Sequence, residues 1–377
     1  MRSLPAGWYL DPAHGPLEFT TVFGRGWQFV CHVADLPAPG TAARFDCAGH
    51  SAFVLRTRTL GLRAFRNACS HRGARLVDGD RSTGFAFCVD GRLRCPYHGW
   101  TYDDLGHLES IPAGQRFDSF DTETASLQSL PVAQWRGLVF AAFGTPERSL
   151  EQALGGAADG WPDVAAMRRV AEPRGVEVAA DWKLACEHVL DTGHLRVMRT
   201  APRSRVLEPT GFSVVGPDAL RAGGGPVDPA RASWPARAYL QLASPSLRAD
   251  WLFLWPGLLL CHAAGVLTVT QVVPLRTGAC RVRAIRYGLP DSTRETRRLR
   301  YLHERVLRRA LQDDARLLER AQHGLGNFEA AATFPVDLSQ DGLCWFVERC
   351  RNALAPAPGK ARPRRARPRK AAAVPTG

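Results

Sequence analysis

The chain has 377 residues, of which 45% are hydrophobic and 23% charged, and its formal net charge is +13. This length allows two domains with buried cores, and the composition is ordinary for a globular protein. No apolar run approaches the ~20 residues of a membrane span, and the longest, Trp251–Leu260, is interrupted by Pro256 and Gly257. The N-terminus lacks the apolar core of a signal peptide. We therefore expect a cytoplasmic protein with no membrane partner, whose ten cysteines are thiols or metal ligands.

Much of the positive charge lies near the C-terminus, where residues 360–370 include seven basic residues and no acidic one. Without these seven charges the formal net charge is +6. The Pro, Ala and Arg composition of this segment offers nothing to bury, which predicts a disordered basic tail over residues 355–377. Contact with an acidic partner or nucleic acid is one interpretation. A solvated tail is the interpretation that composition favours, so nucleic acid is not an expected partner.

The first ~25 residues form an N-terminal segment with a predicted helix near residues 17–23. From residue 26 to about 143, short apolar stretches alternate with Gly, Pro and Asp, as in WQFVCHV, AFVLRTR, LRAFRNA and GLVFAAF. Such runs at close spacing indicate an antiparallel β-domain.

The pattern changes after residue 149. Helical patterns over 151–161 and 181–200 precede strands within 251–263 and 266–275, and a long charged helix is predicted over 293–323. A last helix is predicted over 342–354. We therefore divide the chain into residues 1–148, residues 149–354 and the tail. The sequence contains no G-x-G-x-x-G or Walker-type phosphate loop, and the AGGGP stretch at 222–226 lacks the strand–turn–helix setting of one.

Two short motifs in the first domain carry metal-binding chemistry. They are Cys69-x-His71 and Cys95-x-x-His98. One Cys and one His from each of two loops is the ligand set of a Rieske [2Fe–2S] centre, with two thiolates on one iron and two imidazoles on the other. Zinc fits less well, because zinc sites usually begin with Cys pairs two to four residues apart. The motifs therefore predict a [2Fe–2S] cluster.

Together with the segment PYHGWTY at 96–102, these motifs resemble the large (alpha) subunits of Rieske non-haem iron oxygenases. That family includes aromatic-ring-hydroxylating dioxygenases and related monooxygenases and demethylases. Respiratory Rieske proteins carry an additional Cys in each cluster loop, whereas Ala74 and Tyr97 stand at those places here. The 23 residues between His71 and Cys95 exceed the usual spacing and predict an enlarged hairpin. Cys88 lies within it and is expected to be a thiol that binds no metal.

The resemblance also implies a mononuclear Fe(II) held by two His and one carboxylate. In the family motif Asp191 and His194 match, but Arg199 stands at the second histidine position and His188 at the usual Asn position. The resemblance aligns Asp314 with the carboxylate ligand.

Arginine stays protonated and has no lone pair to donate, so Arg199 is no substitute for a histidine ligand. Three interpretations remain. The site is rebuilt from His188, His194 and Asp314, which requires a bend near Thr192, because residues six apart on a helix lie ~120° around and ~9 Å along it. Alternatively the site is lost, or iron is held by His194 and Asp314 with water or substrate completing the shell.

Asp191 has two interpretations. The resemblance implies that this acid links the cluster histidine of one subunit to the iron histidine of its neighbour and so completes an electron path. The alternative is an ordinary charge at a helix end or on the surface.

The resemblance implies an α+β fold, with an N-terminal Rieske β-domain and a C-terminal helix-covered antiparallel sheet of the helix-grip-like kind, assembled as a homotrimer. The function it implies is O2- and NAD(P)H-dependent hydroxylation, demethylation or desaturation of a small organic substrate. A separate reductase, with or without a ferredoxin, would supply electrons, because the chain shows no flavin or nucleotide motif. The alternative is an electron-transfer or assembly subunit whose mononuclear site does not function.

Overall fold

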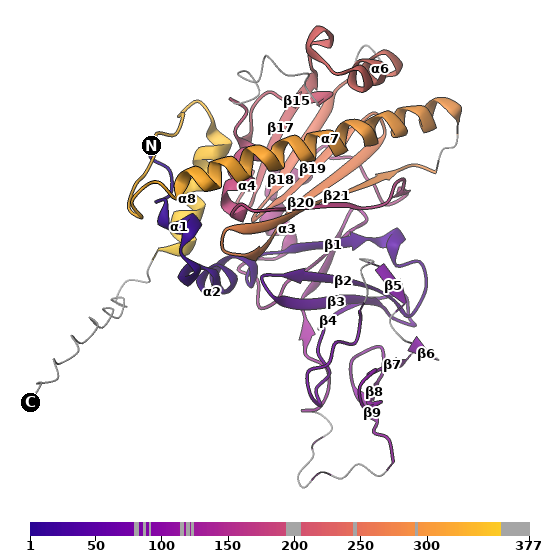
Figure 1. Ribbon diagram of the computed structural model, residues 1–377. Coiled ribbons are helices and arrows are strands. Elements are labelled where there is room, and N and C mark those ends of the chain that lie inside the picture. Colours follow the sequence, from indigo (N-terminus) through magenta and orange to yellow (C-terminus); the bar gives the residue numbers. More distant parts are fainter. Residues whose placement is uncertain are drawn as a thin grey trace, which may run out of the picture.

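The computed structural model describes residues 1–78, 83–85, 88–89, 92–113, 117, 121, 124–193, 205–243, 247–290 and 293–355, with only the backbone for 83–85, 88–89 and 231. His194, Arg199 and the basic tail after residue 355 lie outside the described residues. The predicted α+β fold is confirmed. A small β-domain lies below a large antiparallel sheet, and helices from both ends of the chain lie beside each other at one side (Figure 1).

The N-terminal segment forms short helices, as predicted near residues 17–23. These are α1 (Gly7–Leu10), α2 (Gly15–Glu18) and its continuation as a π-helix, η2 (Phe19–Phe23). The β-domain that follows is entirely antiparallel. Its strands are β1 (Gln28–His32), β2 (Thr41–Cys47), β3 (His50–Arg56), β4 (Leu62–Arg66), β5 (Thr83–Phe85), β6 (Cys88–Val89), β7 (Arg92–Arg94), β8 (Thr101–Tyr102), β9 (Leu108–Ser110), β10 (Ser129–Leu130), β11 (Val132–Trp135) and β12 (Leu138–Ala141).

These strands form three small sheets, in the orders β1-β12-β11, β10-β4-β3-β2-β5 and β6-β7-β8-β9. The long spacing between the cluster motifs is partly used to build β5, which pairs with β2 at the edge of the five-stranded sheet, and β6, which pairs with β7. The predicted enlarged hairpin therefore also adds a strand to the neighbouring sheet. Cys88 lies in β6, where side chains are not described.

The second half is a nine-stranded antiparallel sheet with its helices. The strands are β13 (Arg168–Arg169), β14 (Arg174–Val178), β15 (Leu207–Pro209), β16 (Ser213–Gly216), β17 (Ala219–Pro226), β18 (Ala249–Leu254), β19 (Leu258–Ala263), β20 (Val266–Arg276) and β21 (Ala279–Gly288). The helices are α3 (Leu150–Leu154), α4 (Trp182–Leu190), α6 (Trp234–Leu242), α7 (Arg294–Leu325) and α8 (Asp341–Leu354). The AGGGP stretch belongs to β17, a strand rather than a phosphate loop.

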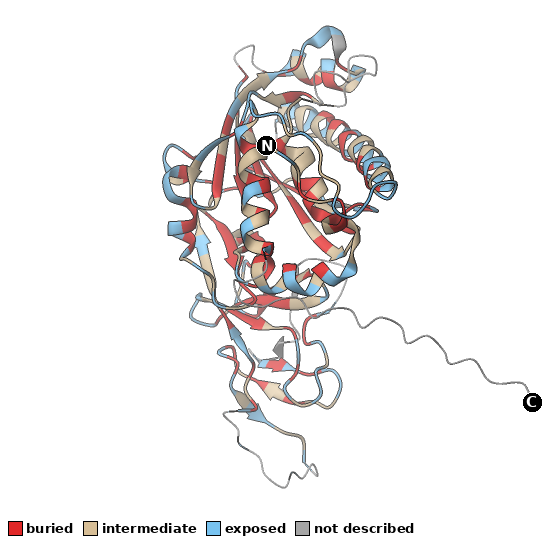
Figure 2. Ribbon diagram, turned by 90° about the vertical axis from the view of Figure 1, so that its left-hand side faces the viewer, coloured by how far each residue is buried: buried red, intermediate tan, exposed pale blue. Residues whose placement is uncertain are grey.

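Helix α7 lies across one face of this sheet and closes the space between the sheet and α4 (Figure 1). It begins at the Thr293 cap, whose hydroxyl accepts the Thr296 N–H at 3.1 Å. Its buried residues, from Leu302 to Leu318, lie on one face, and its other face is exposed (Figure 2). The exposed face is rich in arginine. Among the described residues, no helix combines the length and the apolar character that crossing a membrane requires.

The N-terminal segment is fixed to α4 by buried charges. The ammonium of Lys183 is fully buried between the carboxylates of Glu18 and Asp181, the latter at 2.7 Å. The Tyr9 hydroxyl donates to Glu187 at 2.6 Å, and burial raises the pKa of Glu187 to about 7. Because buried charges are stable only when paired, this network fixes the position of α4 and of the histidine at its end.

Candidate functional site

The two loops with the predicted cluster ligands have the same backbone turn. In each, the Cys N–H donates to the carbonyl five residues later, and the Cys carbonyl accepts from a glycine N–H four residues later, at 2.8 Å for Gly73 and 3.1 Å for Gly99. Both glycines adopt positive φ angles, 71° and 75°, which a residue with a Cβ rarely adopts. The repeat places the buried thiols of Cys69 and Cys95 at equivalent positions, where they interact with each other.

The two predicted imidazole ligands lie side by side. The rings of His71 and His98 are 4.7 Å apart between centroids, and Trp100 stacks on His71 at 4.8 Å with an interplanar angle of 3°. The Nδ1 atom of His71 is buried and has no hydrogen-bond partner in the described part of the chain. A buried nitrogen without a partner is costly unless a metal or a donor satisfies it. Two thiols and two imidazoles, one of which carries this nitrogen, fit a [2Fe–2S] cluster held by two residues on each iron.

The hydroxyl of Tyr102 also contacts the first cluster loop, a contact that the spacing of the ligands does not indicate. The hydroxyl of Tyr102 lies 3.1 Å from Sγ of Cys69 and 3.1 Å from the backbone N of Ser70. Tyr102 is fully buried in β8, so the contact is shielded from water. A hydroxyl that donates to a cluster thiolate tunes the reduction potential.

Asp314 on α7 is the centre of a second polar cluster, in the large domain. Its Oδ1 lies 3.3 Å from Nε2 of His188, and its Oδ2 accepts from Nη2 of Arg205 at 2.6 Å. Burial opposes the charge of Asp314, but Arg205 and His188 outweigh it and hold the pKa of this carboxyl well below its ordinary value. Its neighbour Asp313 instead faces Arg309, at 3.2 Å, on the outer side of α7.

His188 lies beside Asp314, as the interpretation of a rebuilt site requires, but the guanidinium of Arg205 also binds this carboxylate. Sequence reasoning considered Arg199 at this site and missed Arg205. His188 and Asp314 fit an iron site in kind, yet they supply only two donors, and one carboxylate oxygen is already paired. Within the described ranges no group of three His, Cys, Asp or Glu side chains is placed to hold a metal ion. The described residues therefore do not form an iron site on their own.

Helix α4 ends at Leu190, before the bend expected near Thr192. Asp191 follows as the residue after the helix, partly exposed, and its Oδ1 accepts the Gly193 N–H at 2.7 Å. The Thr192 N–H donates to Gln340 before α8 at 3.0 Å. These contacts hold the start of the segment that leads to His194.

The polar cluster opens on an apolar cavity of about 160 Å³ between the sheet, α4 and α7. Its walls are mainly Val, Leu and Ala side chains of α7, α4 and several strands of the sheet, together with Trp251 and Phe212. The polar lining residues are His188, Arg205, Cys261, Thr268, Thr270, His303 and Asp314. A small apolar cavity with a few polar groups is typical of a binding site for a small molecule.

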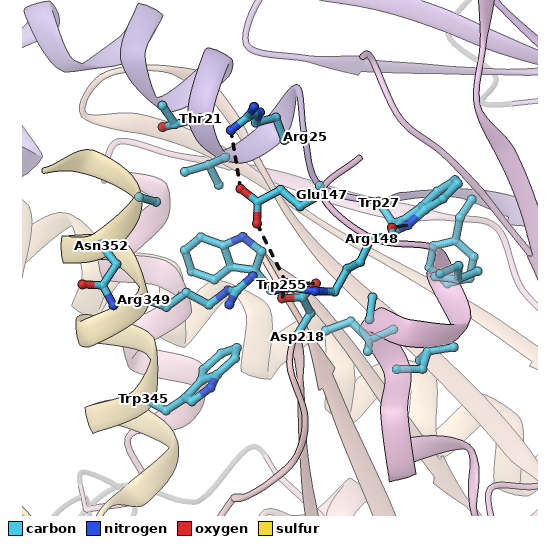
Figure 3. Close-up of a pocket in the computed structure, with 18 of the residues that line it drawn as sticks. Thr21, Arg25, Trp27, Glu147, Arg148, Asp218, Trp255, Trp345, Arg349 and Asn352 are labelled. Carbon is cyan, nitrogen blue, oxygen red and sulfur yellow. Dashed lines mark hydrogen bonds and ion pairs between the residues drawn. The ribbon is translucent and has the colours of Figure 1, made fainter. Parts of the chain in front are cut away.

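A second cavity, of about 300 Å³, lies where the N-terminal helices, the segment after β12 and α8 meet (Figure 3). Several of its charged side chains are paired, including Arg25 with Glu147 at 3.7 Å and Arg148 with Asp218 at 3.2 Å. The guanidinium of Arg349 lies 5.0 Å from the ring centre of Trp255. This cavity contains none of the predicted site residues, and its Arg148–Asp218 ion pair joins the two halves of the chain.

Two family descriptions match the chain. Residues 26–131 match the Rieske [2Fe-2S] domain, and residues 164–351 match the ring hydroxylating alpha subunit catalytic domain. Chlorobenzene dioxygenase subunit alpha of Cupriavidus sp. (strain PS12) is 30% identical over 201 residues, which are 50% of this chain and 43% of that protein. The carnitine monooxygenase oxygenase subunit of Escherichia coli (strain K12) is 28% identical over 196 residues, 51% of this chain and 50% of that protein. The chain thus spans about half the length of these curated relatives.

The fold is also that of solved structures. A quaternary ammonium Rieske monooxygenase aligns over 94% of this chain and 95% of its own, with a TM-score of 0.77 and 20% identity. Naphthalene 1,2-dioxygenase from Rhodococcus sp. aligns over 93% and 94%, with a TM-score of 0.70 and 19% identity. At these identities the likeness concerns the fold. Taken with the two family matches, it shows that the chain belongs to the family of Rieske oxygenase large subunits, whose cofactors are a [2Fe–2S] cluster and a mononuclear iron.

Proposed function

We propose that the chain is the oxygenase component of a Rieske system, which hydroxylates, demethylates or desaturates a small organic substrate with O2 and electrons from NAD(P)H. The observation that carries this proposal is the convergence of His188 and Asp314, 3.3 Å apart, on an apolar cavity in a chain with a full set of cluster ligands. The cavity would hold the substrate and keep water from it.

The proposed roles follow from the positions of the side chains. Cys69, His71, Cys95 and His98 hold the cluster, which supplies one electron at a time when bound. His188 and Asp314, with His194 from outside the described residues, hold the mononuclear iron, which binds O2 when present. Asp191, at the end of α4, joins this site to the cluster of a neighbouring copy. The division at residue 148 separates the two units.

The proposed partners are a reductase that oxidises NAD(P)H, with or without a ferredoxin, and two further copies of the chain in a homotrimer. The competing function, an electron-transfer or assembly subunit, gains support from the Arg205–Asp314 pair alone. The named relatives are oxygenase components, which supports the oxygenase instead.

Iron analysis of the anaerobically purified protein tests the proposal. An oxygenase holds about three irons per chain, two in the cluster and one mononuclear, whereas the competing function leaves about two. A preparation with a complete cluster that never gains the third iron, even when Fe(II) is supplied in excess, would contradict the oxygenase assignment. Changing His98 to Ala should remove the Rieske spectrum and leave the mononuclear iron.

A further inference from the structure

A third cavity, of about 840 Å³, lies in a groove between the β-domain and the large sheet. Its walls come from β2 and the turn after it, from the residue that follows the first cluster turn, and from β14, β20 and β21. Arginine is the commonest lining residue, and both halves of the chain contribute to the set, which is Arg44, Arg75, Arg169, Arg174, Arg281 and Arg283. The groove contains none of the residues assigned to the cluster or to the mononuclear iron.

Four of these arginines are already paired with carboxylates. The ion pairs are Arg44–Asp46 at 3.2 Å, Arg169–Asp35 at 2.7 Å, Arg174–Glu304 at 2.8 Å and Arg281–Glu177 at 2.5 Å. Arg75 and Arg283 form no ion pair within the described residues. In the same part of the chain Glu172 is the lining acid without an ion pair, and it is exposed. Two unpaired cations and one unpaired carboxylate thus line the groove, which leaves it positive.

Arg283, on β21, is the cation least compensated by its surroundings. Its Nη2 donates to the backbone carbonyls of Phe29 and Val30, at 3.4 and 3.0 Å, beside the irregularity in β1. Its Nε is buried without a partner, and its Nη1 also lacks one among the described residues but is not buried as Nε is. Burial lowers the pKa of this guanidinium, and Asp35, which is paired with Arg169, does not offset the loss of water. An anion at Nη1 would supply the missing charge.

Arg75 supplies a second cation, which a ligand reaches from solvent. It is exposed and directly follows the turn that carries Cys69 and His71. Its whole guanidinium is available, whereas Arg283 offers the two N–H groups of Nη1. An oxyanion that pairs with both arginines would link the first cluster loop to the large sheet.

We propose that this groove is an anion site, at which Arg283 and Arg75 bind a divalent oxyanion (a phosphate group or two carboxylates) of a small molecule. The volume lies in the range of about 300–1,000 Å³ that is typical of small-molecule sites, and it leaves room for an organic part. Guanidinium groups match both phosphate and carboxylate, and the positive lining disfavours a cation. The site is separate from the cavity beside Asp314 and does not depend on the proposed function.

Calorimetric titration of the cluster-loaded full chain with inorganic phosphate and, separately, with succinate tests the proposal. Ionic strength is held constant, so that screening is the same in every titration. The two anions distinguish a phosphate ligand from a dicarboxylate. The test variants are Arg283→Gln, Arg75→Gln and Glu172→Gln, and thermal unfolding checks that they fold. The matched control is Arg72→Gln, which removes an exposed arginine of the same cluster loop that does not line the groove.

We expect the wild type to bind at least one of the two anions. Arg283→Gln should weaken that binding at least about tenfold, because a buried charge-assisted bond is lost. Arg75→Gln should weaken it about twofold to fivefold, since its bond is exposed, and Arg72→Gln should leave it unchanged. Glu172→Gln should tighten it, because this change removes a carboxylate that repels the ligand.

No binding of either anion by the wild type would overturn the inference. Equal weakening by Arg72→Gln and Arg75→Gln, which would mean attraction to the basic surface in general, or weaker binding by Glu172→Gln would also overturn it. If Arg283→Gln does not fold, Arg75→Gln and Glu172→Gln still decide, because both change exposed side chains. These measurements need neither O2 nor the mononuclear iron, so their failure would leave the proposed function intact.

Discussion

Replacing Arg205 with glutamine should strengthen binding of Fe(II) at Asp314. The guanidinium donates to Oδ2 at 2.6 Å, with side-chain exposures of 30% for Arg205 and 22% for Asp314. An incoming cation must displace this donor or share the carboxylate with it, and like charges at one carboxylate repel. Arg205 therefore competes with incoming Fe(II) for the carboxylate of Asp314.

The size of the effect follows from the geometry of the pair. A hydrogen bond to a charged group contributes about 1.5–3 kcal/mol when buried. Partial exposure of both side chains reduces this to about 1–2 kcal/mol. Removing the competitor should therefore lower the dissociation constant for Fe(II) about fivefold to thirtyfold.

The assay is an anaerobic titration of cluster-loaded protein with Fe(II), followed by metal analysis per chain. Arg309→Gln is the matched control, because it removes a surface pair with Asp313 at 3.2 Å on the same helix. Asp314→Asn should abolish the third iron in either background. Unchanged or weaker Fe(II) binding by Arg205→Gln would refute the competition and make Arg205 a structural partner of Asp314. If the wild type holds two irons per chain and Arg205→Gln holds three, the natural chain is an electron-transfer or assembly subunit.

Three further predictions concern other parts of the chain. The cluster should have a reduction potential near the low end of the Rieske range. Tyr102→Phe should lower this potential by about 20–60 mV, because the hydroxyl bond that is lost is stronger to the reduced cluster. Redox titration measures the potential. Lys183→Met should destabilise the fold by about 3–5 kcal/mol in urea unfolding, because two buried carboxylates lose their cation, and neutralising both carboxylates should recover part of the loss. Truncation after Leu354 should leave cluster content and melting temperature unchanged, since the tail has no large apolar side chain to dock beyond Val374.

The predictable parts of the structure are those that local sequence determines. Helix α7 covers Arg294–Leu325 against a predicted 293–323, because a stripe of apolar residues at helical spacing and a threonine cap both lie within the segment. Helix α8 (Asp341–Leu354) matches the predicted 342–354 through its apolar stripe, since Gln340 at its start makes no capping hydrogen bond through its side chain. The cluster ligands are readable because each pair lies within four residues of one tight turn, which two glycines with positive φ angles permit.

The parts that sequence reasoning missed depend on residues far apart in the chain. Arg205 reaches Asp314 across 109 positions, and no local pattern relates them. Thr268 of β20 and His303 of α7 line one cavity although they lie 35 positions apart in the chain. Tyr102 belongs to the recognised motif, but its bond to Cys69 becomes visible only when β8 is placed beside the first loop.

The last prediction concerns the path of the electron. Within one chain the cluster loops lie beyond the five-stranded sheet from α4 and α7 (Figure 1). Around the cluster Tyr97 is 63% exposed and Phe117 40% exposed, an aromatic surface that a second chain could cover. We therefore expect electrons to cross between copies.

Mixing two inactive variants tests this path. His98→Ala lacks the cluster and Asp314→Asn lacks the mononuclear iron, so neither homotrimer should oxidise substrate. Refolded or co-expressed at equal amounts, they form mixed rings in which about a quarter of the sites pair an intact cluster with an intact iron site of the neighbouring chain. Activity near a quarter of wild type is therefore expected. Mixed assemblies that form but stay inactive would place electron transfer within one chain, and Asp191 would then have no role between subunits.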